Sequence, residues 1–222
     1  MNQKFLFAWD FHGTLEKDNV YAVQELCNLV LDNFGFDKRI TKKEAIDWYG
    51  LSWLDYFKLA VPRGNYQLWK KMVDKVESLG ERGWAIIKKH VKLREFSKEV
   101  LKKIQNEGHQ SIVISNARPQ HIKAFVNFFN LSKYFDDIIG VDTHQKSRLK
   151  KETKELKGKA LADFLKDKKY QKVIMIGDNE SDIRAGKDCG AITYLFVDLK
   201  INKKPKNTDA DYIISDLRKV LE

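Results

Sequence analysis

The residues of this sequence best suited to chemistry are two acidic groups, each placed directly after a short apolar run. The first run is Phe5–Trp9, and Asp10 and a Gly-Thr turn follow it. The second is Val173–Ile176, which leads through one glycine to Asp178 and then to Asp182. A short apolar run that ends at an acid and a turn predicts a buried strand with a carboxylate at its tip. Two such tips predict a site for a divalent metal ion and a phosphate group, at the edge where open α/β sheets bind ligands.

Strand-like runs and helical patterns alternate along most of the chain. After Phe5–Trp9, further strands are predicted at residues 111–114, 138–141, 173–176, 192–196 and 212–214. Helical patterns separate most of them, and strands that alternate with helices imply a parallel sheet covered on both faces. We therefore predict an α/β fold with a Rossmann-like parallel sheet as its core.

One long insertion interrupts this alternation. From Asp18, which is suited to cap a first helix, to His90, apolar residues recur at helical spacing. Between Leu15 and Gln110 the sequence shows no convincing strand. The chain thus divides into an α/β core and an α-helical insertion: residues 1–15 with 94–222, and residues 16–93.

The composition is that of an ordinary globular protein with a basic surface. The chain has 222 residues, a length sufficient to bury a full core. Of these residues 43% are hydrophobic and 32% charged, as is usual for globular proteins. The net charge of +10 comes mostly from lysines interleaved with acids, which favours a solvated surface or a field that attracts anionic substrates. A nucleic-acid binder is expected to interleave aromatic with basic residues, and the separation of the two here argues against one.

The cellular compartment is indicated by what the sequence lacks. No apolar run reaches the length of a membrane span, and the N-terminus leads straight into the first predicted strand, which argues against a signal peptide. Cys27 and Cys189 are too few for a disulfide framework or a zinc site. We expect a cytoplasmic protein with no membrane partner, and the sequence leaves its oligomeric state open.

Four sites follow one another in order along the chain. They are Asp-x-x-Gly-Thr-Leu at residues 10–15, Ser115 after the strand at 111–114, Lys157 in Lys-Gly-x-Ala-Leu, and Gly-Asp-x-x-x-Asp at residues 177–182. With the helical insertion after the first, this set resembles the haloacid dehalogenase superfamily of phosphohydrolases over essentially the whole chain. The resemblance implies a phosphatase whose helical insertion is a cap that selects the substrate.

The resemblance also implies that phosphate passes first to an aspartate and then to water. Asp10 is the expected nucleophile, which forms an aspartyl-phosphate. Ser115 is expected to donate a hydrogen bond to a phosphoryl oxygen, and Lys157, at the start of a helix predicted near residues 159–165, to offset negative charge. Simpler roles stay open: Asp10 as a turn residue, Ser115 as a turn or cap residue, and Lys159 in place of Lys157.

The resemblance implies Mg²⁺ as the cofactor. This hard cation suits the site because it prefers carboxylates, water and substrate oxygens as ligands. Its expected protein ligands are Asp10, Asp178 and the backbone carbonyl of His12. Asp182 is expected to bind the metal or to orient its waters, and a simple contact with a helix N-terminus is the alternative. Substrate binding is assigned to three further residues: Thr14, Asn116 and Arg118.

His12 is the residue at which the sequence departs from the family, since most of its phosphatases carry a second aspartate there to protonate the leaving oxygen and activate water. Imidazole also performs general acid–base work, so a phosphatase adapted to histidine is the first interpretation. Two alternatives stay open: a relative with phosphonate-cleaving or phosphoryl-transfer chemistry, and a binding protein whose turnover is impaired. The partner expected for an active enzyme is a small phosphorylated metabolite, which the sequence does not identify.

Overall fold

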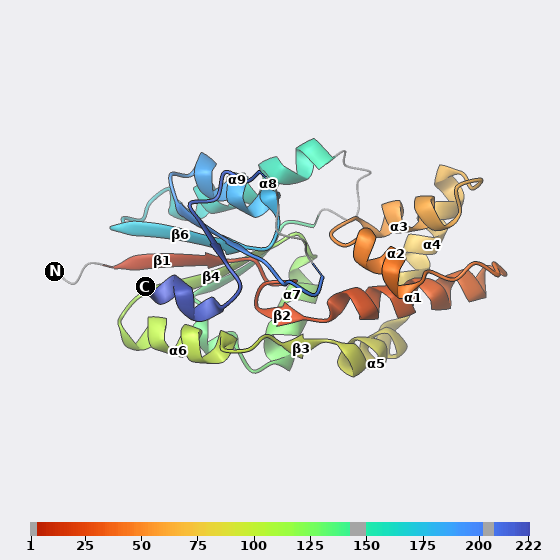
Figure 1. Ribbon diagram of the computed structural model, residues 1–222, viewed down its shortest axis with the longest axis horizontal. Helices are drawn as coiled ribbons and strands as arrows, with labels where there is room; N and C mark the ends of the chain where they lie inside the picture. The colour runs from red at the N-terminus through yellow and green to blue at the C-terminus, as the bar shows by residue number, and fades with distance from the viewer. Residues whose placement is uncertain (1–3, 143–149, 202–206) are drawn as a thin grey trace. The chain divides into compact units, whose positions relative to one another are not determined.

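Six parallel strands form the main sheet of the computed structural model, which describes residues 4–142, 150–201 and 207–222 (Figure 1). Their order across the sheet is β5-β4-β1-β6-β7-β8. The strands are β1 (Phe5–Trp9), β4 (Gln110–Ser115), β5 (Asp137–Gly140), β6 (Lys172–Gly177), β7 (Ile192–Phe196) and β8 (Tyr212–Ile214). The predicted α/β fold with a Rossmann-like parallel sheet is confirmed.

Helices cover this sheet on both faces, with α8 and α9 on one face and α6 on the other (Figure 1). The central strand β1 pairs with β4 at one edge and with β6 at the other, and the helices cover its two faces (Figure 1). This explains its unbroken apolar sequence, because a strand buried on both faces has no reason to alternate. The helices of this unit are α6 (Ser97–Asn106), α7 (Pro119–Phe128), α8 (Lys150–Leu165) and α9 (Glu180–Asp188), with 3₁₀ turns at Ser132–Tyr134 and Leu217–Leu221.

Contacts within the chain separate two compact units. The first, Met1–Glu16 with Leu93–Glu222, contains the main sheet, and the second is Lys17–Lys92. The second unit is built from helices, which are α1 (Asn19–Asn33), α2 (Lys42–Asp47), α3 (Trp53–Ala60), α4 (Tyr66–Glu77) and α5 (Gly80–His90). The chain crosses between the units through β2 (Glu16–Lys17) and β3 (Lys92–Leu93), which form a two-stranded sheet.

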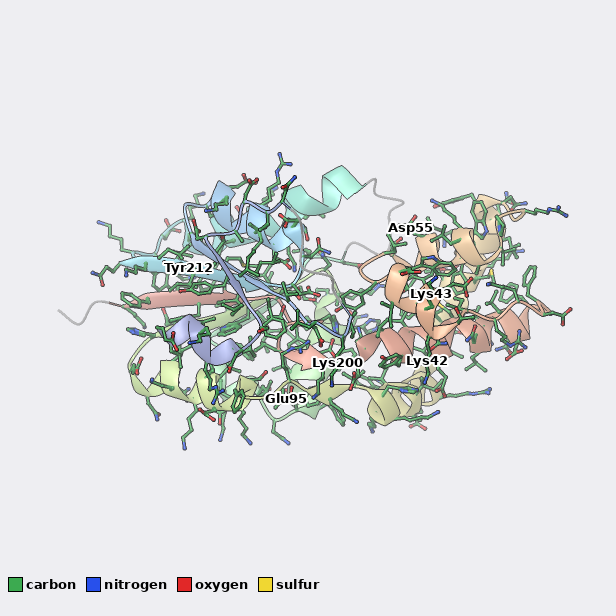
Figure 2. The ribbon with its side chains drawn as sticks, viewed as in Figure 1. Lys42, Lys43, Asp55, Glu95, Lys200 and Tyr212 are labelled. Atoms are coloured by element: carbon green, nitrogen blue, oxygen red, sulfur yellow. The ribbon has the colours of Figure 1, made fainter. Side chains whose placement is uncertain are left out.

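Local capping rules explain where the short helices of the second unit begin. Thr41 and Glu44 form a reciprocal capping box at the start of α2, and the side chains of Ser52 and Asn65 accept the backbone N–H groups at the starts of α3 and α4. Lysines carry much of the surface charge: Lys42 and Lys43 are exposed on α2, as is Lys200 in the loop after β7 (Figure 2).

Three local expectations differ from the structure in whole or in part. The strands β2 and β3 were not expected before Gln110, because a two-residue strand shows no periodicity of its own. Asp18 occupies the N-cap position of α1, as expected, but it does so in the left-handed conformation (φ 68°) and makes no side-chain cap hydrogen bond. Helix α8 begins at Lys150, so Lys157 lies inside it and not at its start. The segment before Lys157 is rich in lysine and glutamate, which favour helices but provide no apolar periodicity to reveal one.

Candidate active site

The register of the sheet brings the ends of three strands together. Trp9 at the end of β1 is aligned with Val113 on β4 and with Ile176 on β6, and the backbone N–H of Asp10 donates to the Ile176 carbonyl at 2.8 Å. The next residues of each strand therefore leave the sheet at the same edge. Asp10 and Asp178 follow β1 and β6 at this edge, and Ser115 is the last residue of β4.

A buried lysine joins two of the acidic residues. Lys157 Nζ donates to Asp10 Oδ1 at 2.5 Å and to Asp182 Oδ1 at 2.5 Å. All three side chains are at most 7% exposed. Burial acts to lower the pKa of Lys157, but the two carboxylates outweigh it and raise the pKa, so the ammonium stays charged. Lys159, the alternative in the sequence, is exposed.

Three carboxylates meet closely enough to share one cation. Oxygens of Asp10, Asp178 and Asp182 all lie within 4.8 Å of one another. Carboxylate oxygens are the ligands that Mg²⁺ prefers, so this donor set fits the ion. Burial raises the pKa of Asp182, an effect that Lys157 opposes and the charge of Asp10 reinforces.

Asp182 is held in place from two sides. It is the third residue of α9, where its Oδ2 accepts the backbone N–H of Asn179 at 3.1 Å within a capping box, while its Oδ1 faces Lys157. Asp182 thus caps helix α9 and also belongs to the acidic cluster. Gly177 makes room for this carboxylate, because a Cβ at that position would lie 2.3 Å from the Cβ of Asp182.

Ser115 and the residues after it form the adjoining part of the edge. Ser115 is buried, and its Oγ accepts the backbone N–H of Ala117 at 3.2 Å, which leaves the hydroxyl proton as a donor. Asn116 and Arg118 are half-buried in the turn that follows. Arg118 Nε lies 3.5 Å from Asp142 Oδ1, in the segment after β5. The turn holds serine, amide and guanidinium groups side by side along the chain.

His12 contacts an acid that the sequence analysis did not consider. Its Nδ1 lies 3.0 Å from Oε1 of Glu16, and the same oxygen accepts the backbone N–H of Gly13 at 3.2 Å. The ring also packs edge-on against Phe125, with centroids 4.7 Å apart. Glu16 is fully buried, whereas the His12 side chain is 24% exposed. The only sequence signal for this pair was an acid four residues after His12, directly after the Leu of the first motif.

Arg94 is a second residue that sequence reasoning missed. Its buried guanidinium donates to the backbone carbonyls of Thr14, Gly13 and Glu16 at 2.8, 2.8 and 3.3 Å, and to Asp198 at 3.0 Å. It therefore fixes the turn of the first motif from about eighty residues away, a distance at which sequence spacing carries no information. Thr14 is fully buried there, and its hydroxyl has no hydrogen-bond partner among the residues described.

Comparison with known proteins agrees with this arrangement of strands and motifs. Residues 7–196 match the family model described as haloacid dehalogenase-like hydrolase. The chain belongs to this family. The resemblance inferred from the sequence motifs is confirmed, and with it the prediction that the chain is a hydrolase of this family. Hydrolases of this superfamily generally depend on a metal ion, and the acidic cluster of this chain is able to hold one.

Individual relatives extend the similarity over the whole chain. A provisionally named pyrophosphatase, PpaX, from Caldanaerobacter subterraneus subsp. tengcongensis is 25% identical over 96% of this chain and 91% of its own length. A pyrophosphatase PpaX from Halalkalibacterium halodurans is 22% identical over 96% of this chain and 94% of its own. The crystal structure of a provisionally named phosphatase from Clostridium difficile is similar with a TM-score of 0.78 and 19% identity, over 100% of this chain and 98% of that one. Within the part of the chain that the structure describes, no helix is long and apolar enough to cross a membrane.

Proposed function

We propose that this protein is a Mg²⁺-dependent phosphohydrolase that acts on a small phosphorylated molecule through an aspartyl-phosphate on Asp10. The observation that carries the proposal is the contact of one buried ammonium, Lys157, with both Asp10 and Asp182 at the edge of the sheet where Asp178 also lies. A carboxylate that attacks a phosphate needs positive charge beside it, because both groups are anionic. Family membership and relatives named as pyrophosphatases support the same chemistry.

The proposed reaction has two displacements at phosphorus. In the first, an oxygen of Asp10 forms a bond to phosphorus, and the bond from phosphorus to the leaving oxygen breaks as that oxygen takes up a proton. In the second, water adds to the same phosphorus, the bond to Asp10 breaks, and inorganic phosphate leaves as the water gives up a proton. The family's usual acid–base position is filled by His12, which we assign to these proton transfers.

The other residues of the edge bind and neutralise the phosphoryl group. Lys157 offsets charge beside the nucleophile, and the Ser115 hydroxyl donates to a phosphoryl oxygen. Mg²⁺ would be held by Asp10, Asp178 and the carbonyl of His12, with Asp182 beside it, and would supply further positive charge to the phosphoryl oxygens. Three residues are proposed to contact the substrate: Thr14, Asn116 and Arg118.

We further propose that the helical insertion, residues 16–93, acts as a cap that selects the substrate. Helical insertions of this kind close over the site and exclude water in the resembled enzymes. The names of the two PpaX relatives make inorganic pyrophosphate a candidate substrate, beside sugar phosphates and nucleotides. A cytoplasmic location is part of the proposal, since these phosphorylated compounds are found there.

Phosphate release from a panel of substrates, with Mg²⁺ and with a chelator, tests the proposal. The panel contains pyrophosphate, sugar phosphates, nucleotides, an aryl phosphate and a phosphonate. We expect Mg²⁺-dependent release from at least one phosphate compound, and its loss in Asp10→Asn, which keeps the shape of the side chain but removes the nucleophile. Turnover that survives in Asp10→Asn would contradict the nucleophile assignment. If the phosphonate alone is cleaved, the protein is a phosphonate-cleaving relative and not a phosphohydrolase.

A further inference from the structure

The acid that contacts His12 is buried to an extent unusual for a carboxylate. Glu16 is 0% exposed and follows the first motif directly. One oxygen, Oε1, accepts the Gly13 N–H at 3.2 Å and lies 3.0 Å from His12 Nδ1. The other, Oε2, is buried and has no hydrogen-bond partner among the described residues. A half-satisfied carboxylate in the interior lowers stability, so an apolar residue would serve packing better.

The hydrogen bonds at Oε1 determine where the proton of the His12 ring lies. An ionised carboxylate has no proton to donate, so with Glu16 ionised the proton shared between Oε1 and the ring belongs to Nδ1. In a neutral imidazole a proton on Nδ1 leaves Nε2 with a free lone pair. The contact with Glu16 therefore selects the tautomer in which Nε2 is the basic nitrogen.

Aromatic contacts fix the plane of the same ring. Phe125 meets the His12 ring edge-on at 4.7 Å between centroids, and Phe11 does so at 5.5 Å. Glu16 restrains rotation about the ring axis, since it holds Nδ1 on one side. The partly exposed imidazole, two residues from Asp10, is thus restrained in both orientation and tautomer.

We propose that Glu16 is a positioning residue that holds His12 with its proton on Nδ1 and Nε2 ready to accept a proton from water. In the second displacement the water proton passes to Nε2, the water oxygen bonds to phosphorus, and the bond from phosphorus to Asp10 breaks. The inference rests on the proposed function, because it assigns Glu16 a part in the breakdown of phospho-Asp10. A histidine held by a buried glutamate would thus do the work of the family's second aspartate.

The geometry allows this role to be tested apart from the shape of the turn. Arg94 holds the turn through the backbone carbonyls of Gly13, Thr14 and Glu16, so Glu16→Leu leaves these hydrogen bonds in place and removes only the one donated by the Gly13 N–H. The chain also offers a matched control. Glu25 contacts His90 at 2.6 Å in the helical unit, where its side chain is 37% exposed.

The kinetic experiment compares Glu16→Leu, Glu16→Gln and His12→Ala, with Glu25→Leu as the control. For Glu16→Leu we expect kcat to fall about tenfold or more, KM to fall with it, and phospho-Asp10 to accumulate in rapid quench, because the second displacement, which needs Nε2 as a base, is slowed most. Glu16→Gln still offers an oxygen to Nδ1 and should restore most of the rate. Glu25→Leu should not cause phospho-Asp10 to accumulate.

A double variant distinguishes positioning from general support of the fold. If Glu16 acts through His12, adding Glu16→Leu to His12→Ala should cost nothing more in kcat, whereas independent effects multiply. Multiplied effects, or a fall in kcat with no accumulated phospho-Asp10, would overturn the proposal. Should Glu16→Leu fold poorly, Glu16→Asp keeps the charge but shortens the side chain, and the same outcomes apply to it.

Nitrogen-15 NMR of labelled histidine separates this inference from the proposed function, since it needs no substrate. We expect the His12 ring, assigned with His12→Asn, to carry its proton on Nδ1 in the parent and to redistribute it in Glu16→Leu. A proton on Nε2 in the parent would overturn the role of Glu16. Failure of the proposed function would show instead as an absence of any Asp10-dependent phosphate release.

Discussion

Each of the two units contains an ionic cluster of three side chains, and the two clusters differ in charge balance and burial. The buried cluster of the α/β unit consists of Lys157, Asp10 and Asp182. The surface cluster of the helical unit consists of Glu25, Lys89 and His90. In the buried cluster one cation pairs with two acids, and the side chains are 1–7% exposed. In the surface cluster one acid pairs with two basic groups, and the side chains are 23–61% exposed.

The comparison shows how burial decides what a group of charges can do. Water screens the surface cluster, so its members lose little when separated, and such pairs contribute at most about 1 kcal/mol. The members of the buried cluster have lost their hydration, so each depends on the others, and removing one partner of such a pair costs about 3–5 kcal/mol. That dependence makes the buried cluster a costly means of stabilising a fold. It is better suited to holding charge ready for an anionic substrate and a metal ion.

The largest effect is expected from removing the shared cation of the buried cluster. Lys157→Met should lower turnover by about 100-fold or more, because two carboxylates then face the phosphate without the ammonium. It should also lower the free energy of unfolding by about 3–5 kcal/mol. Steady-state kinetics and urea unfolding measure the two effects. Lys159→Met, at an exposed position two residues away, is the control, and similar losses in both variants would remove the distinction between the two lysines.

An intermediate effect is expected from disturbing the geometry of the buried cluster without changing its charge. In Gly177→Ala the new Cβ would lie 2.3 Å from the Asp182 Cβ, so this side chain must shift. We expect turnover to fall about 10- to 100-fold through misplacement of the site, and stability to fall by about 1–3 kcal/mol through overpacking.

Gly158→Ala provides the comparison for Gly177→Ala. A Cβ there meets Ala185 Cα at 3.6 Å, an ordinary contact, and the residue lies within α8. Its effect on turnover should be small, and its effect on stability slightly favourable because alanine suits a helix interior better than glycine. Unchanged turnover in Gly177→Ala would mean that the position of Asp182 is not critical.

The smallest effect is expected at the surface cluster. Hydrogen bonds from His90 and then Lys89 lower the pKa of Glu25 from its ordinary value of 4.5. A carboxylate with a lowered pKa stabilises the fold at pH values above 4.5, and this contribution is lost as pH falls through the lowered pKa. Glu25→Gln should therefore cost about 0.2–1 kcal/mol at neutral pH and less below pH 4.5, as measured by urea unfolding. A loss as large as that of Lys157→Met would contradict the contrast between the clusters.

Local sequence patterns were sufficient for the sheet and for the family. The apolar run Phe5–Trp9 and its counterparts are strands because buried residues of a parallel sheet need no alternation, and that property is local. The motif residues Asp10, Asp178 and Asp182 follow strand ends, so knowing the strands was enough to place their backbones at one edge. Their roles in turnover stay predictions, which the variants above test.

The contacts that organise the site were decided by tertiary structure alone. Only the resemblance of a motif favoured Lys157 over Lys159 in the sequence, and the packing of α8 against α9 determines which one is buried beside Asp10. Arg94 contacts the first motif although the whole helical insertion separates the two in the sequence. Glu16 is buried against His12 because the turn folds back on itself. Periodicity reports which face of an element is buried. Only the folded chain determines which side chains from distant segments share that interior, because desolvation and hydrogen bonding depend on every neighbour at once.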